Sequence, residues 1–277
     1  MKFVEKLAAA SRKNNSLLCV GLDPEPSRFP PAYIGEPELS SVVNFCHRII
    51  EATAPYVCAF KPNSAFFEVL GEAGMQALHE VVKVIPADIP VIYDGKRGDI
   101  GNTARNYAAT IFDVYNFDAA TVNPYLGYDS VRPFLAYRDK GVILLCRTSN
   151  PGARDFQDLP VQVDGDVRPL YEVIAQKVQT WNTEGNCGLV VGATYPEELA
   201  RLRALCPDMC ILIPGVGAQG GDLAASVRAG VDVNGENAII SVSRGILYAG
   251  DGDEFAEAAA KEARRLRDRI NDARYDR

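Results

Sequence analysis

Three features of the sequence predict a single (β/α)8 TIM barrel, an α/β fold whose active site lies at the carboxyl ends of its strands. Short apolar runs alternate with helical patterns along the whole chain. The runs are continuously apolar, which is typical of parallel strands covered by helices. The length of 277 residues suits such a barrel, which takes about 250 residues. No composition shift or linker divides the chain, so residues 1–277 are predicted to form one domain.

The apolar runs define eight predicted strands. In chain order these are residues 17–23, 57–63, 90–96, 119–125, 142–149, 188–193, 211–217 and 238–244. The first seven residues have the pattern of an amphipathic helix. Residues 64–85 carry apolar side chains at helical spacing, and Gly71 and Gly74 are expected to interrupt this helix. A last, charged helix carries its apolar face at Phe255, Ala259, Leu266 and Ile270.

Composition excludes several classes of protein. A net charge of −7, with no Lys/Arg block and no zinc-finger spacing, argues against a nucleic-acid-binding surface. No signal peptide is visible, and no apolar run approaches the roughly 20 residues of a membrane span. The seven cysteines are scattered without C-x-x-C spacing. Cys19, Cys58 and Cys146 lie inside apolar strand-like runs and are interpreted as reduced core residues of a cytoplasmic protein.

The third predicted strand leads into three charged residues with the spacing D-x-K-x-x-D, namely Asp94, Lys96 and Asp99. Side chains alternate along a strand, so Asp94 and Lys96 point the same way, and Asp99 follows just past the strand. A lysine between two carboxylates is a plausible device for handling a proton. Charged residues at a strand end can also simply meet water, and both interpretations remain open at this point.

Polar residues occur at the carboxyl ends of the predicted strands, and a barrel places all of these ends on one face. We therefore expect one ring of donors, acceptors and charges. Its members are Asp23, Lys61, Asp94, Lys96, Asn123, Ser149, Gly215, Gly217 and Arg244. Residues 150–168 follow the fifth strand and are too long for a plain connection, so they are a candidate lid. An idle surface loop is the alternative.

The segment 214–222 contains G-x-G-x-x-G. A dinucleotide site is rejected, because that fingerprint belongs to the first βα unit of a doubly wound fold and this one follows the seventh strand. In barrels the loops after strands seven and eight commonly bind phosphate. Arg244 would add a charge-assisted contact, although the glycines could serve tight turns only. The backbone groups expected to face phosphate belong to Gly215, Gly217, Gly220 and Gly221.

Three further strand-end residues suit a sugar and a heterocycle. Asp23 could accept hydrogen bonds from sugar hydroxyls, and Lys61 could bind both a hydroxyl and a carboxylate. Ser149 can donate and accept, as recognition of a heterocycle edge requires. Each alone is more often a capping, surface or turn residue.

A resident metal is not predicted. His47 and His79 lie in helical segments away from strand ends and are assigned to surface or packing roles. No histidine or carboxylate cluster has the spacing of a zinc or iron site. Asp94 and Asp99 could hold magnesium, but Lys96 between them would compete for both carboxylates.

The stretch Asp94-Gly-Lys96-Arg-Gly-Asp99-Ile-Gly-Asn-Thr103 resembles the signature of the orotidine 5′-phosphate decarboxylase family. Asp23, the loop 214–222 and Arg244 follow in the expected order. Residues 60–68 and 148–154 resemble the longer bacterial-type branch. The resemblance covers essentially the whole chain. It implies decarboxylation of orotidine monophosphate to uridine monophosphate and carbon dioxide, in de novo pyrimidine biosynthesis, with no cofactor.

The resemblance also implies roles for individual residues. Lys96 is the proton donor to C6 of the pyrimidine. Asp94 and Asp99 hold Lys96 charged and oriented, and Asp94 faces the departing carboxylate. The same resemblance assigns the ribose to Asp23 and Lys61, the pyrimidine edge to Ser149, and the phosphate to Gln219 with Arg244.

Family members are usually homodimers, with the equivalents of Asp99 and Thr103 reaching into the partner's site. The implied partners are therefore the nucleotide substrate and a second copy of the chain, with no nucleic acid and no membrane.

Three rival functions stay open on the residues alone. A magnesium-dependent decarboxylase or aldolase barrel acting on sugar phosphates would lose activity in a chelator. A Schiff-base aldolase using Lys96 or Lys61 would be trapped by borohydride, although neighbouring carboxylates disfavour a neutral amine. A catalytically silent nucleotide-binding barrel would bind uridine monophosphate without turning over orotidine monophosphate.

Overall fold

The structure is a computed structural model that describes residues 1–33, 35–216 and 222–275. Its central feature is an eight-stranded parallel sheet in the order β2-β1-β10-β9-β8-β5-β4-β3. Isolated parallel bridges, Phe60 with Val91 and Asn63 with Asp94, join β2 to β3 and bring the two edges together. The strands are β1 (Leu18–Leu22), β2 (Ala59–Pro62), β3 (Ile92–Arg97), β4 (Ala119–Val122), β5 (Gly141–Arg147), β8 (Cys187–Val191), β9 (Cys210–Pro214) and β10 (Ala238–Val242). The predicted TIM barrel is confirmed.

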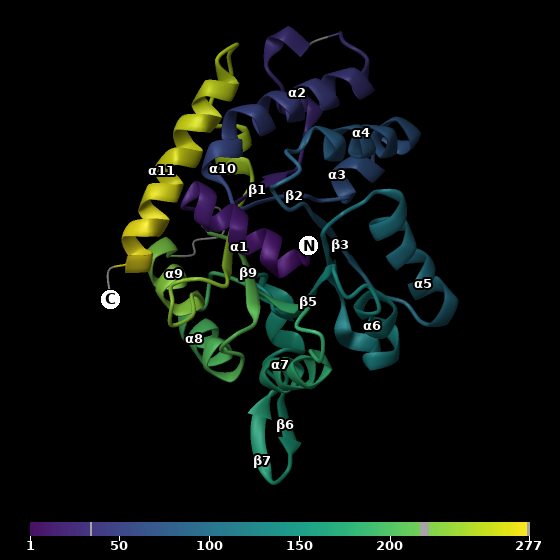
Figure 1. The fold of residues 1–277 in the computed structure, drawn as a ribbon, viewed down its shortest axis with the longest axis vertical. Helices are drawn as coiled ribbons and strands as arrows, with labels where there is room; N and C mark the ends of the chain where they lie inside the picture. The colour runs from purple at the N-terminus through teal and green to yellow at the C-terminus, as the bar shows by residue number, and fades with distance from the viewer. Residues whose placement is uncertain (34, 217–221, 276–277) are drawn as a thin grey trace.

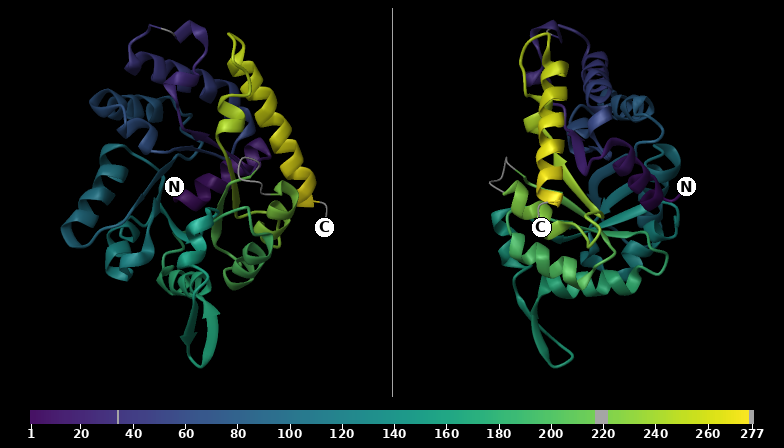
Figure 2. Two further views of the ribbon diagram at one scale, coloured as in Figure 1. Left: turned by 180° about the vertical axis from the view of Figure 1, so that it is seen from behind. Right: turned by 60° about the vertical axis from the view of Figure 1, so that its left-hand side comes forward.

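Helices surround the strands (Figures 1 and 2). The α-helices are α1 (Phe3–Asn14), α2 (Glu38–Thr53), α3 (Ala65–Glu68), α4 (Gly71–Val84), α5 (Gly101–Ala109), α6 (Tyr128–Leu135), α7 (Leu170–Trp181), α8 (Pro196–Leu205), α9 (Leu223–Gly230), α10 (Arg244–Leu247) and α11 (Phe255–Tyr275). Short 3-10 turns are η1 (Pro26–Arg28), η2 (Pro31–Tyr33), η3 (Ala54–Tyr56), η5 (Pro124–Leu126) and η6 (Pro151–Asp155), and α5 continues into the π-helical turn η4 (Thr110–Val114). Within the described residues, no helix has both the length and the apolar character needed to cross a bilayer.

The amino-terminal helix α1 covers one end of the barrel (Figure 1). Its Phe3 and Leu7 are buried against the side chains that fill the barrel interior. A Cβ on Gly141 would lie 2.3 Å from the Phe3 ring, so this close approach requires glycine. The opposite end is left for a ligand. The interior is filled by Cys19, Cys58, Ala59, Ile92, Ala119, Ile143, Val190, Cys210, Leu212 and Ile239.

The last helix packs as its pattern predicts. Phe255, Ala259, Leu266 and Ile270 of α11 are all buried. Phe255 stacks on Phe45 of α2 with ring centroids 5.1 Å apart, so the last helix is joined to the first barrel unit. All seven cysteines are buried and free of disulfides.

The predicted break in residues 64–85 is confirmed, but its two glycines act differently. Gly71 starts α4 with φ +64, a left-handed conformation that glycine adopts without strain. Gly74 lies inside α4 and does not interrupt it. A Cβ on Gly74 would lie 1.9 Å from the Phe67 carbonyl oxygen, so Gly74 allows α4 to pack closely on α3.

Most predicted strands extend past the observed carboxyl ends. The fifth ends at Arg147 and the sixth at Val191, each two residues before its predicted end. The fourth ends at Val122, because Pro124 starts η5 and has no N–H to continue the ladder. The eighth ends at Val242, and Arg244 instead begins α10. The seventh strand is observed only as far as Pro214, and its predicted end at Gly217 lies outside the described residues.

The lid prediction for residues 150–168 is wrong for its second half. Strands β6 (Pro160–Val163) and β7 (Asp166–Pro169) pair antiparallel as a hairpin. In every view this hairpin extends outward beyond α7, away from the barrel axis (Figures 1 and 2). The first half, including η6, stays beside the end of β5.

Candidate active site

The site is built around Asp94, a buried carboxylate within β3. Its Oδ2 accepts a hydrogen bond from Nζ of Lys61 on β2 at 2.7 Å. Its Oδ1 accepts one from Nζ of Lys96 at 2.7 Å and a second from Oγ1 of Thr121 on β4 at 3.0 Å. Two lysines and one threonine from three neighbouring strands therefore fix the orientation of a single carboxylate.

Mutual attraction keeps the buried groups of this array charged. Burial alone would raise the pKa of Asp94, but Lys61 and Lys96 outweigh it and hold this pKa well below its usual range. Burial would likewise lower the pKa of Lys61, yet the Asp94 and Asp23 carboxylates outweigh it and raise this pKa. The pair is consequently ionised at neutral pH.

Lys96 has an unusual backbone conformation. It has φ +46, in the left-handed region, and the register between β3 and β4 shifts between Tyr93 and Arg97. The neighbouring Arg97 guanidinium is paired with Glu68 and donates to the Tyr93 hydroxyl at 2.9 Å. The Lys96 side chain is 46% exposed, whereas Asp94 and Lys61 are buried. Lys96 is thus the member of the array that a ligand can reach.

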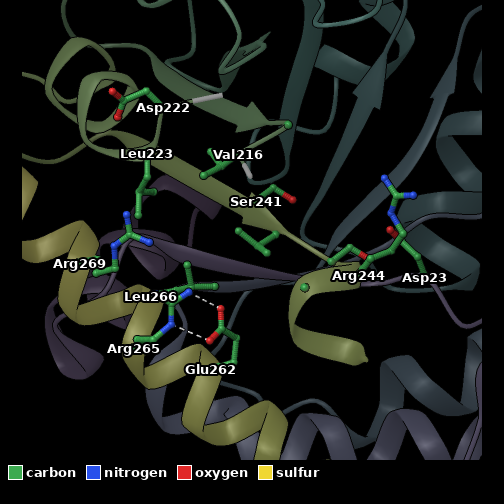
Figure 3. A pocket seen from close by; sticks show the side chains of 14 residues that line it. Asp23, Val216, Asp222, Leu223, Ser241, Arg244, Glu262, Arg265, Leu266 and Arg269 are labelled. Carbon is green, nitrogen blue, oxygen red and sulfur yellow. Dashed lines mark hydrogen bonds and ion pairs between the residues drawn. The ribbon is translucent and has the colours of Figure 1, made fainter. Parts of the chain in front are cut away.

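Asp23 follows β1 and lines a cavity of about 570 Å³ with residues that follow β9 and β10. Its Oδ1 and the Ser243 Oγ are buried without a hydrogen-bond partner among the described residues. An unsatisfied buried acceptor is costly, so these atoms suit the polar groups of a ligand. Figure 3 shows Asp23 and Arg244 at one end of the cavity, and Arg265 and Arg269 of α11 at the other.

Two of the residues predicted to bind phosphate can be located in the structure. Gly215, with φ +92, and Arg244 line the same cavity. The Arg244 side chain is exposed and has no ion pair within the described part of the chain, so its charge is available to an anion. The predicted residues Gly217, Gln219, Gly220 and Gly221 lie outside the described residues.

Ser149 lies at the end of β5, close to β8. A Cβ on Gly192 would lie 2.7 Å from the Ser149 Cβ, so glycine makes room for it. The preceding Thr148 is held by Gln157, which accepts from its N–H at 2.8 Å and donates to its hydroxyl at 2.9 Å. Arg147 is buried, with its guanidinium 4.3 Å from the Tyr195 ring centroid.

Among the described residues, no hydrogen bond or ion pair joins Asp99 or Thr103 to the Lys96 side chain, which contacts Asp94. The Asp99 carboxylate accepts a hydrogen bond from the Ile100 N–H at 2.7 Å. Thr103 is exposed on α5. The two residues are therefore free to meet a different group.

Within residues 1–33, 35–216 and 222–275, no three His, Cys, Asp or Glu side chains are grouped so that they could hold a metal ion. His47 is exposed, and the His79 ring packs edge-on against Tyr115 with centroids 5.8 Å apart.

The sequence patterns above do not single out Thr121 or Arg97. A threonine within the apolar run 119–122 is the signal that could have indicated Thr121. No comparable signal marks Arg97, since it resembles any charged residue at a strand end.

Comparisons with known proteins agree on one family. The model of the "Orotidine 5′-phosphate decarboxylase / HUMPS family" matches residues 16–259. An orotidine 5′-phosphate decarboxylase of Dehalococcoides mccartyi is 53% identical over 271 residues, covering 98% of each chain. Another from Ralstonia pickettii is 51% identical over 276 residues, covering 99% of this chain and 100% of that protein. The solved structure of Leishmania donovani OMP decarboxylase superposes with a TM-score of 0.85 at 44% identity, covering 99% of each chain.

Proposed function

Because this chain belongs to the orotidine 5′-phosphate decarboxylase / HUMPS family, we propose that the array around Asp94 is its catalytic centre. The protein is a decarboxylase, a lyase that converts orotidine 5′-monophosphate to uridine 5′-monophosphate and carbon dioxide in pyrimidine biosynthesis. The observation that carries the residue assignment is the pair of 2.7 Å contacts from Lys61 and Lys96 to the two oxygens of Asp94.

The chemistry demands a nearby cation. When the bond between C6 and the carboxylate breaks, carbon dioxide leaves and the electron pair stays at C6, in a ring-plane orbital that the ring cannot delocalise. The Lys96 ammonium stabilises this charge and then transfers a proton from Nζ to C6. Lys96 is exposed enough to recover that proton from water.

Asp94 holds Lys96 in place for this transfer and faces the departing carboxylate. Its own orientation is fixed by Lys61 and Thr121, so the ammonium is positioned before the substrate arrives. Preorganised charge of this kind costs no rearrangement during the reaction.

The nucleotide's ribose and phosphate supply binding energy away from the reacting bond. Asp23 Oδ1 has no hydrogen-bond partner in the described part of the chain and suits a ribose hydroxyl, and the Asp23 charge acts on Lys61. Gly215 and Arg244 line the cavity and suit the phosphate. Ser149, which follows β5, suits the pyrimidine edge because its hydroxyl can donate and accept. Binding energy of this remote kind can be used to lower the barrier at C6.

A homodimer with shared sites completes the proposal. Asp99 and Thr103 of each chain would enter the partner's site, where Asp99 would approach Lys96 from the side that Asp94 leaves open. Support comes from the exposed apolar side chains that follow β3 and β4 near these residues, because such side chains are typical of interfaces. They are Ile100, Tyr125, Leu126 and Tyr128. We also place the enzyme in the cytoplasm, which seven free, buried cysteines support.

The rival mechanisms fit the geometry less well. Both oxygens of Asp94 already accept from ammonium groups, which disfavours Asp94 as a magnesium ligand. The raised pKa of Lys61 disfavours a neutral amine at that residue for Schiff-base chemistry.

An absorbance assay with orotidine monophosphate, with and without chelator, tests the proposal. We expect wild-type turnover to be unaffected by chelator. Lys96→Ala should lose turnover by several orders of magnitude while circular dichroism shows a folded protein. Near-normal turnover in Lys96→Ala would refute the assignment of Lys96, and loss of wild-type activity in chelator would favour the magnesium-dependent rival.

A further inference from the structure

We propose that Thr121 is a positioning residue, whose hydroxyl holds Asp94 and the backbone of Lys96 in their working arrangement. Thr121 lies in the middle of β4 and is 1% exposed. Its neighbours along the strand are Ala119, Ala120 and Val122. A hydroxyl buried in such a strand is unfavourable unless its hydrogen bonds are made, so its partners define its role.

The hydroxyl bridges two parts of the catalytic centre. It accepts a hydrogen bond from the Lys96 N–H at 3.0 Å and donates to Asp94 Oδ1 at 3.0 Å. The Tyr93 carbonyl oxygen is farther away, at 3.5 Å. Because a hydroxyl has one proton to donate, the shorter contact to the charged carboxylate is favoured. The Thr121 Oγ1 atom thus links the Lys96 backbone to the Asp94 carboxylate. The Lys96 ammonium contacts the same carboxylate.

The register between the strands explains why Thr121 has this place. Tyr93 of β3 pairs with Ala120 of β4, but the next pair is Arg97 with Val122. Three residues of β3 (Asp94, Gly95 and Lys96) therefore lie opposite one residue of β4, Thr121. In a regular ladder each of the three would have its own partner on β4. The interrupted ladder offers the Lys96 N–H no backbone acceptor from β4, and the Thr121 hydroxyl accepts its hydrogen bond instead.

The same contact stabilises the left-handed backbone of Lys96, which has φ +46. A residue other than glycine is strained there, and the surrounding contacts must hold it. Without the hydroxyl, the Lys96 N–H and Asp94 Oδ1 would each lose a partner. The ammonium would then occupy a wider range of positions, and proton transfer to C6 would slow. Contacts to the ribose and phosphate are made by other strands and would persist.

The test compares Thr121→Val, which keeps the shape and removes the hydroxyl, with Thr121→Ser, which keeps the hydroxyl. We expect Thr121→Val to lower kcat for orotidine monophosphate by about ten- to a hundredfold, with KM changed by less than about threefold. Thr121→Ser should stay within about threefold of wild-type kcat. The matched control is Thr53→Val, which removes a buried hydroxyl that donates to the Ile49 carbonyl far from the site, and it should lower the melting temperature without lowering kcat.

The outcomes separate this inference from the proposed function on which it rests. An inactive Lys96→Ala with a fully active Thr121→Val would overturn the role of Thr121 alone. Equal loss of kcat in the Val and Ser variants would also overturn it, because packing of the methyl group would then matter. A normal Lys96→Ala would overturn the role of Lys96 first. Should Thr121→Val not fold, Thr121→Ala against Thr121→Ser isolates the hydroxyl, and equal kcat values would again refute the inference.

Discussion

Asp94 shows why buried charge at an active site cannot be judged by stability alone. A buried ion pair often contributes little net stability, because desolvation offsets the attraction between its members. Here the ion pair with Lys61 determines how the Asp94 carboxylate is oriented. It orients the carboxylate so that its second oxygen meets Lys96, 2.7 Å away. Lys61 therefore acts on Lys96 through Asp94, although the two lysines share no contact of their own.

Asp94→Asn tests this arrangement through stability. At pH 7 we expect the free energy of unfolding to fall by about 3 kcal/mol, because the buried Lys61 ammonium loses its partner. The folded pKa of Asp94 lies below its unfolded value. Its contribution is thus fully present above about pH 4 and is lost as pH falls through the folded pKa. Urea unfolding should show a smaller difference between wild type and variant at pH 3 than at pH 7.

The matched control for that experiment is Asp88→Asn. Asp88 also has a lowered pKa, caused first by its hydrogen bond from Lys13, but the pair is exposed. Its removal should change stability little at either pH. A difference at Asp94 that is equal at pH 3 and pH 7 would contradict the expected ionisation.

At the scale of elements, the end of β5 depends on the segment that follows it. Arg147 lies buried against Tyr195 and pairs with Asp158 through a 3.2 Å contact. Gln157 holds Thr148 by two hydrogen bonds. These contacts attach residues 150–159 to the barrel beside Ser149. The segment thus supports the site from the side, while the hairpin beyond it points away.

Gln157→Ala tests whether this attachment matters for binding. On the proposal that Ser149 contacts the pyrimidine, losing two hydrogen bonds next to it should raise KM about tenfold. Steady-state kinetics with orotidine monophosphate would measure this change. Gln162→Ala, on the exposed hairpin, is the control and should leave KM unchanged. An unchanged KM in Gln157→Ala would show that the segment does not support the substrate site.

At the scale of the whole molecule, Asp99 and Lys96 of one described chain make no ion pair with each other, which supports a second copy as the source of the second carboxylate. An equimolar mixture of Lys96→Ala and Asp99→Ala subunits, unfolded and refolded together, tests it. Half of the random dimers are mixed, and each has one site with both native residues. We expect about one quarter of the wild-type activity from two inactive parents. A mixture as inactive as its parents would contradict shared sites.

Much of the fold follows from local pattern. Strand positions, the break at Gly71 and the buried face of α11 could be predicted, because apolar periodicity and glycine conformation act over a few residues. Asp94 and Lys96 could be predicted as neighbours because they lie two residues apart in one strand, although the left-handed backbone at Lys96 departs from regular alternation. The resemblance added chemical roles to residues that the barrel places on one face.

The sequence by itself thus determined the barrel, the family and the charged strand end. Only the tertiary structure decided that Lys61 meets Asp94, that Thr121 faces an interrupted ladder and that residues 160–169 turn outward. These facts depend on which strands are neighbours and in what register. Register is set by contacts between residues distant in the chain, and no local pattern encodes it. Thr121 looks like an ordinary strand residue until β3 is placed beside it.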